Sequence, residues 1–170
     1  MPAVRLAFAL SLTAVFLVLL NACEKDDICV EGDTPLLVIT FFDAENPETA
    51  KEANRLRIIG LGQGDPITPS DRQTRDSIAI PLRPDTTRTG FVFILNSESD
   101  DDGNETGNRD TLYFDYSTDE LYVSRACGFV SQYDGLSDEL TPDSENWILD
   151  VEVIQTAVTS SVSAHVNIQH

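Results

Sequence analysis

Three carboxylates in one acidic stretch have the spacing of calcium ligands. Glu98, Asp100 and Asp102 occupy alternate positions before Gly103, like the oxygen ligands at positions 1, 3 and 5 of calcium loops with glycine at position 6. The pattern fails at position 12, because Arg109 stands where such loops carry a bidentate glutamate. We therefore expect a solvated hairpin loop. Calcium is a weak alternative, and no other cofactor is suggested.

Cys23 lies where an apolar N-terminal run gives way to charged residues. The run Leu6–Leu20 is uncharged and shorter than the ~20 apolar residues of a membrane-spanning helix, so it fits the core of a signal peptide. It ends in LNAC at 20–23, which resembles the bacterial lipobox, where the cysteine thiol receives a diacylglycerol and the chain is cut before it. We expect residues 1–22 to be a lipoprotein signal peptide and Cys23 to anchor the mature chain, since two or more acyl chains hold stably. A plain signal peptide with a chance cysteine is the alternative.

The residues after Cys23 suggest which way the protein faces. Lys25, Asp26 and Asp27 follow closely and resemble the surface-export signal of Bacteroidetes lipoproteins, in which a lysine and two acidic residues come soon after the lipidated cysteine. The resemblance implies the outer leaflet of the outer membrane, with the protein facing the cell exterior. A solvated tether at the periplasmic face is the alternative.

The two remaining cysteines form an even pair. With Cys23 lipidated, Cys29 and Cys127 are left, and an even remainder in an exported protein suggests a disulfide. Two buried free thiols are the alternative. Metal binding by them is disfavoured, because the chain has no CxxC and no histidine close in sequence to either cysteine.

The sequence offers no recognisable catalytic motif. Nucleophilic catalysis needs a base near the nucleophile, and the two histidines are His165, expected on the polar face of the last strand, and the final residue, His170. No GxSxG elbow occurs, and the glycines of Gly60–Gly64 predict a turn rather than a phosphate loop. We assign no catalytic residue and expect a non-catalytic binding or scaffolding domain. A surface hydrolase with a site assembled from dispersed residues is the alternative.

The charge balance limits the partners. The chain has 11 Lys+Arg against 29 Asp+Glu, a formal net charge of −18, whereas nucleic-acid binding depends on cations at the phosphates. Nucleic acid is therefore excluded as a partner. The expected partners are the membrane, through the lipid anchor, and an unidentified protein or glycan.

Most of the remaining chain has the pattern of short strands, with a period of two or apolar runs bounded by turn residues. The expected strands are Leu36–Phe42, Leu56–Leu61, Ser77–Leu82, Gly90–Asn96, Thr111–Tyr116, Leu121–Ala126, Phe129–Tyr133, Trp147–Ile154 and Ser161–Ile168. So many short strands predict one antiparallel β-sandwich, immunoglobulin-like, over residues 34–170. Residues 23–33 would be the lipidated cysteine and an acidic tether.

Several local features carry their own expectations. Ser117–Glu120 is a good tight turn between two strands, and Asn46–Ala53 begins like a helix but is too short to stand alone, so it should be a crossover turn. Trp147 alternates with Leu149 on an apolar face and should belong to the core. Arg125 lies in an otherwise apolar strand and should be buried beside a carboxylate or carbonyl partner.

Six short segments of the mature chain also share a family pattern. They are CEKDDIC (23–29), RIIGLG (57–62), SIAIPL (77–82), YVSRACGF (122–129), NWI (146–148) and AHV (164–166). Together they resemble a family of uncharacterised Bacteroidetes lipoproteins classed as a domain of unknown function (six-four-five-two). The resemblance implies a lipoprotein of one β-rich domain and brings no activity and no functional residues.

Overall fold

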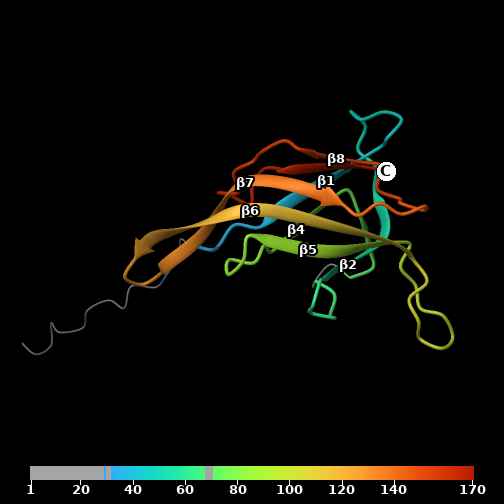
Figure 1. Cartoon of the computed structure of the whole chain (residues 1–170), viewed down its shortest axis with the longest axis horizontal. Coiled ribbons are helices and arrows are strands. Elements are labelled where there is room, and N and C mark those ends of the chain that lie inside the picture. The colour runs from blue at the N-terminus through green and yellow to red at the C-terminus, as the bar shows by residue number, and fades with distance from the viewer. Residues whose placement is uncertain (1–28, 30–31, 68–70) are drawn as a thin grey trace, which may run out of the picture.

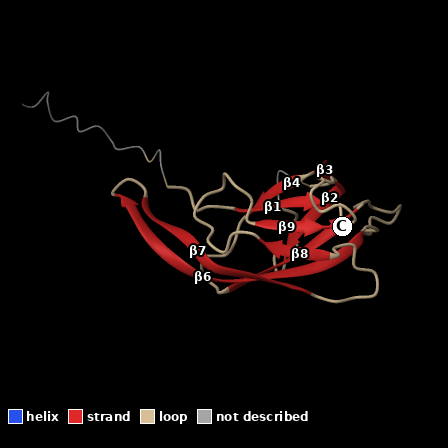
Figure 2. Cartoon of the chain, turned by 90° about the horizontal axis from the view of Figure 1, so that it is seen from above, coloured by secondary structure: helices blue, strands red, loops and turns tan. Residues whose placement is uncertain are grey.

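The fold was analysed in a computed structural model, which describes residue 29, residues 32–67 and residues 71–170. In this part of the chain all regular elements are strands, arranged in two sheets that face each other as a sandwich (Figures 1 and 2). The strands are β1 (Leu37–Phe42), β2 (Ala53–Gly60), β3 (Gln73–Arg75), β4 (Ser77–Ile80), β5 (Arg88–Leu95), β6 (Asn108–Ser124), β7 (Gly128–Leu140), β8 (Asp150–Val153) and β9 (Val166–Gln169). The expected all-β sandwich is confirmed.

Strand pairing is antiparallel with one exception. The four-stranded sheet has the order β4-β1-β9-β8 and the five-stranded sheet the order β3-β2-β5-β6-β7. In the first sheet β1 and β9 are parallel, with Ile39 opposite Val166, so the expectation of a purely antiparallel sandwich is wrong at this pair. The two strands lie at opposite ends of the chain, and no tight hairpin between them dictates an antiparallel direction.

The core lies between the sheets and follows the period-two pattern. On β1, Leu37, Ile39 and Phe41 are fully buried while the residues between them are only partly covered. Phe91 and Phe93 of β5 face the same interior from the other sheet. Trp147 joins this core as expected, and its indole N–H donates to the carbonyl oxygen of Phe93 over 3.3 Å.

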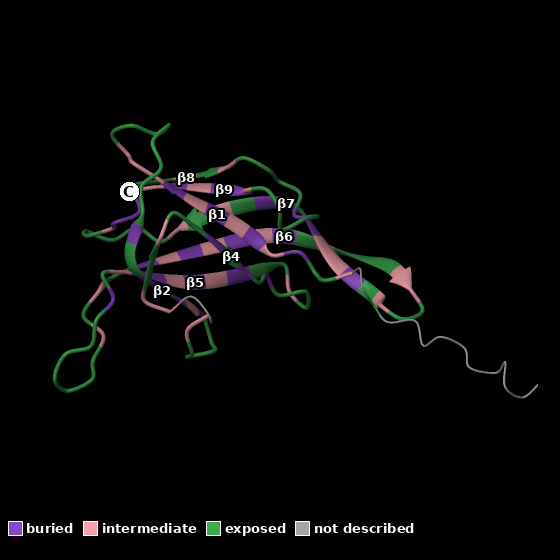
Figure 3. Cartoon of the chain, turned by 180° about the vertical axis from the view of Figure 1, so that it is seen from behind, coloured by how far each residue is buried: buried purple, intermediate pink, exposed green. Residues whose placement is uncertain are grey.

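The β6–β7 hairpin is longer than the sandwich needs. β6 has 17 residues and β7 has 13, but β5 pairs with β6 only as far as Asp115, opposite Arg88. Beyond that point the hairpin continues without β5, and it projects from one end of the sandwich (Figures 2 and 3). We call its projecting part, residues 119–132, the arm; Tyr133 at its base still belongs to the core.

The arm corrects two expectations. Ser117–Glu120 is not a turn but lies within β6, paired with residues 131–134 of β7. Polar residues are accepted there because most of these side chains are exposed, so their turn propensity does not decide the backbone. The chain turns instead at residues 125–127 before Gly128, which adopts a φ of 71° that favours glycine. Arg125 is consequently exposed in the turn and not buried.

The C-terminal strands are shorter than their alternation suggested. Leu149 and Val162 are exposed, and β8 and β9 begin only at Asp150 and Val166. Trp147 and Ile148 are both buried although they are neighbours, so this stretch enters the core as an irregular segment before the strand starts. The prediction that Asn46–Ala53 connects strands without a helix holds as far as residue 52, and Ala53 already begins β2. The turn itself starts earlier, at Asp43, whose N–H donates to the Thr49 carbonyl over 3.0 Å.

Candidate functional site

The end of the arm is tied to the chain near its start. Cys29 and Cys127 form a disulfide across 98 residues of sequence, with their Cα atoms 4.9 Å apart, inside the ~7 Å that a disulfide allows. The expected pairing is therefore present in the structure. It fixes the beginning of the described chain to the turn of the β6–β7 hairpin.

Residues 32–36 lead towards β1 and lie against the arm. Gly32 has a φ of 121°, and a Cβ atom there would lie 3.3 Å from atoms of Cys127, Val123 and Val130. Further on, the backbone N–H of Ser131 donates to the Thr34 hydroxyl over 3.4 Å. The glycine thus permits a close approach that covers Val130, which is buried. We call residues 32–36 the strap.

Large apolar side chains gather in the open near the arm's turn. Leu121, Tyr122 and Phe129 are 50%, 54% and 65% exposed. Tyr122 and Phe129 are opposite each other in the ladder, and their rings meet edge to face with centroids 5.4 Å apart. Leu121 precedes Tyr122 in β6 and therefore points to the other face of the hairpin, so exposed apolar side chains lie on both faces of the arm's end. Exposed apolar surface of this kind is typical of contact sites. We call these three residues the tip cluster.

The residues expected to direct anchoring, Cys23, Lys25, Asp26 and Asp27, lie outside the described part of the chain. Within residues 29, 32–67 and 71–170, no helix has the length and apolar character required to cross a membrane.

The acidic loop uses its carboxylates internally. Glu98 forms an ion pair with Arg55, with 2.6 Å between Oε1 and Nη1. The Asp100 carboxylate accepts the backbone N–H groups of Asp102 and Asn104 over 3.0 and 2.7 Å. Hydrogen bonds lower the pKa of Asp100, and the one from the Asn104 side chain has the largest effect. Among the described residues no group of three or more His, Cys, Asp or Glu side chains is placed to hold a metal ion. Glu98, Asp100 and Asp102 are thus not brought together as a calcium site in this structure.

A buried carboxylate at the base of this loop was not expected from the sequence. The Glu105 side chain is 8% exposed and lies 3.0 Å from Arg57 and 3.4 Å from Arg72. It also accepts the Ser97 hydroxyl over 2.8 Å. Burial alone would raise the pKa of Glu105, but hydrogen bonds from Ser97, the Gly107 N–H and the two arginines outweigh burial and lower the pKa from 4.5 to about 2. Glu105 is thus held as a carboxylate that fastens the loop to β2.

Both histidines serve the fold. His165 was expected on a polar strand face but is buried, and its Nδ1 accepts the Val38 N–H over 3.1 Å. Burial lowers the pKa of His165 and of His170. The His170 ring packs edge-on against Trp147, with centroids 5.4 Å apart. A catalytic base needs a free imidazole nitrogen to accept a proton. In His165 the accepting nitrogen, Nδ1, is already hydrogen-bonded to the backbone N–H of Val38 in β1.

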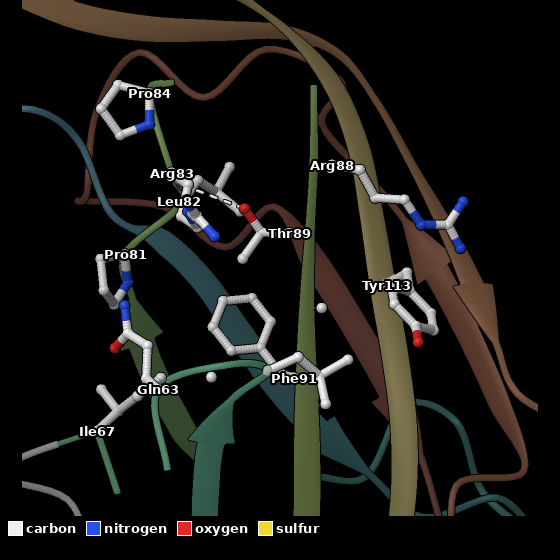
Figure 4. Close-up of a pocket in the computed structure, with 13 residues that line it drawn as sticks. Gln63, Ile67, Pro81, Leu82, Arg83, Pro84, Arg88, Thr89, Phe91 and Tyr113 are labelled. Carbon is white, nitrogen blue, oxygen red and sulfur yellow. Dashed lines mark hydrogen bonds between the residues drawn. The ribbon is translucent and has the colours of Figure 1, made fainter. Parts of the chain in front are cut away.

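The sandwich carries a groove of roughly 400 Å³. It lies beside the start of β5, between the turn after β2 and the segment after β4, as Figure 4 shows. Much of its lining is apolar: Leu61, Ile67, Pro81, Leu82, Pro84, Phe91 and Tyr113. A side chain at Gly90 would have to displace Leu61 and the Tyr113 ring, because a Cβ atom there would come within 2.5 Å of Leu61 and 2.7 Å of the ring.

The charges at the rim of the groove are already paired. Arg88 lies 4.3 Å from the centroid of the Tyr113 ring and forms ion pairs with Asp115 at 3.2 Å and Glu139 at 2.6 Å. Arg83 pairs with Asp85 at 3.1 Å. The groove is therefore suited to an uncharged or apolar group and not to a highly charged one.

These features define a class of protein: a disulfide-bonded β-sandwich with a projecting hairpin arm, tied near the start of its chain to the arm's turn. Residues 55–170 match the sequence profile of a protein family described as "Family of unknown function (DUF6452)". The chain belongs to this family. No curated protein and no solved structure matches the chain significantly.

Proposed function

We propose that this protein is a surface-exposed outer-membrane lipoprotein whose β-sandwich acts as a non-catalytic binding or scaffolding module. In this proposal residues 1–22 are a signal peptide of a Bacteroidetes-type lipoprotein, and Cys23 carries the lipid. Lys25, Asp26 and Asp27 direct the protein to the cell exterior. The sandwich, proposed to be immunoglobulin-like, presents its groove to a protein or glycan partner.

The Cys29–Cys127 disulfide is the observation that carries the proposal. Structural disulfides persist in oxidising compartments outside the cytoplasm. The chain has three cysteines, and the bond uses two of them, which leaves Cys23 for the modification that its lipobox-like context suggests. Cys29 stands only six residues after Cys23, so the bond fixes the folded domain close to the proposed lipid.

The anchor is tested by replacing Cys23 with alanine. We expect the Cys23→Ala protein to lose the lipid and to leave the outer-membrane fraction, because two or more acyl chains are what hold a lipoprotein stably. Metabolic labelling with a radioactive fatty acid and fractionation of membranes report the two effects. Cys29→Ala is the matched control, since it removes a cysteine and should keep the lipid. Association of Cys23→Ala protein with outer membranes at the wild-type level would contradict the anchor.

The orientation is tested by a triple alanine variant at Lys25, Asp26 and Asp27. We expect it to stay lipidated while becoming less accessible to protease on intact cells, because the proposed export signal is lost and the anchor is not. The readout is proteinase digestion of intact and permeabilised cells. An Asp101→Ala variant, at an exposed acid of the loop, is the control, because it also removes one net negative charge. Unchanged accessibility of the first variant would contradict the surface location.

A further inference from the structure

We propose that the tip cluster lies in the interfacial layer of the bilayer that holds Cys23, so that the arm is a second, shallow membrane contact. This inference rests on the proposed lipidation of Cys23. It goes beyond that proposal because it assigns a lipid-facing surface on the folded domain.

The disulfide sets the distance between the tip cluster and the lipid. Cys29 is six residues after Cys23, and a fully extended chain spans at most ~3.6 Å per residue, so Cys29 stands within about 22 Å of a lipidated Cys23. Cys127 shares the bond with Cys29. Phe129 is two residues beyond Cys127. The arm's turn cannot be far from the membrane surface.

The chemistry of the arm's end fits that layer. Seven large hydrophobic side chains of the described residues are exposed, and three of them form the tip cluster. Aromatic side chains such as Tyr122 prefer the headgroup level, where an apolar ring and a polar end are both satisfied. Arg125, exposed in the turn, can extend its guanidinium to lipid phosphates while its stem lies along apolar surface.

Charged residues in the β6–β7 pairing limit how deep the arm can enter the bilayer. Glu120 and Asp119 are exposed one and two residues before the tip cluster, opposite Ser131 and Gln132. Charged groups are costly in the hydrocarbon core. The membrane contact is therefore confined to the last few residue pairs of the arm, at the depth of the lipid headgroups.

The test uses the full lipidated protein reconstituted in vesicles of phosphatidylethanolamine and phosphatidylglycerol. Trypsin cleavage after Arg125 is compared for wild type and for the variant Tyr122→Ser/Phe129→Ser. We expect the wild-type bond to be cleaved roughly tenfold more slowly in vesicles than in the Cys23→Ala protein free in solution, as for burial of about one aromatic side chain. The double variant should lose this protection in vesicles and be cleaved like wild type in solution.

A second measurement does not depend on loss of side chains. In a Phe129→Trp variant the introduced indole should be quenched by nitroxide lipids labelled near the headgroup and much less by lipids labelled deep in the chain. The matched control is Leu149→Trp, at an exposed position outside the arm, which should not be quenched.

The outcomes separate this inference from the proposed function. A wild-type protein that carries no lipid and does not enter vesicles would contradict the proposed function, and the inference with it. A lipidated, vesicle-bound protein whose position 129 is not quenched and whose Arg125 is cleaved at the solution rate would overturn the inference alone. Protection in native membranes but not in protein-free vesicles would also overturn it, in favour of a protein neighbour at the tip cluster.

Discussion

Removal of the bridge by the double substitution Cys29→Ser/Cys127→Ser is expected to lower the free energy of unfolding by about 2–5 kcal/mol, as is typical of native disulfides in small exported domains. The loop closed by the bond spans 98 residues, and in the chain-entropy model a loop of about 100 residues restricts the unfolded state by up to ~4.7 kcal/mol. The readout is urea denaturation of the disulfide-bonded protein, followed by its tryptophan fluorescence, since Trp147 is in the core.

The reductant provides the matched control. Dithiothreitol should lower the stability of the wild-type protein to that of the double variant and should leave the variant unchanged. Wild-type stability that is insensitive to reductant, or labelling of both thiols in unreduced, denatured protein, would contradict the bond.

Replacement of Glu105 is expected to have a comparable effect and to change the acid response. In the unfolded chain Glu105 takes up its proton near the ordinary pKa of 4.5, but in the folded protein only near the pKa of about 2. Between these pH values the unfolded state binds more protons than the folded state. The stabilisation that Glu105 contributes is therefore fully present above about pH 5 and is lost as the pH falls towards 2. A shift of this size corresponds to roughly 3 kcal/mol.

A Glu105→Gln variant should therefore be less stable than wild type by about 2–3 kcal/mol at pH 7 and should lose less stability between pH 5 and pH 2. Urea denaturation at a series of pH values measures both effects. Glu48→Gln, an exposed residue of the turn after β1, should follow the wild-type curve. Parallel curves for wild type and Glu105→Gln below pH 5 would show that Glu105 does not carry the acid response.

The architecture was predictable from sequence where one strand face meets the core and the other meets solvent. The alternation in Leu37–Phe42 gives β1 directly, and the Trp147 prediction holds because a large ring in an apolar run has no better place than the core. The Ser117–Glu120 prediction failed because turn propensity is a local quantity, whereas this stretch is held in β6 by its ladder with β7. The parallel pairing of β1 with β9 has no local signal, since it depends on where two distant segments meet.

Part of the candidate site could be predicted from the sequence and part could not. The Cys29–Cys127 pair could be inferred by counting cysteines. The role of Glu105 could not, because its partners Arg57, Arg72 and Ser97 come from three separate segments. The tip cluster could not be predicted, because the sequence around Leu121 and Phe129 has the pattern of a buried strand. These side chains are exposed only because the arm projects beyond β5.

The bond at the arm's turn also determines how the domain would bear mechanical load. From Cys29 one path of covalent bonds continues through the strap into β1 of the four-stranded sheet, and a second crosses to Cys127 and enters β6 and β7 of the five-stranded sheet. A force applied to the chain before Cys29 would thus be divided between both layers of the sandwich. The strap therefore does not carry the whole tension by itself.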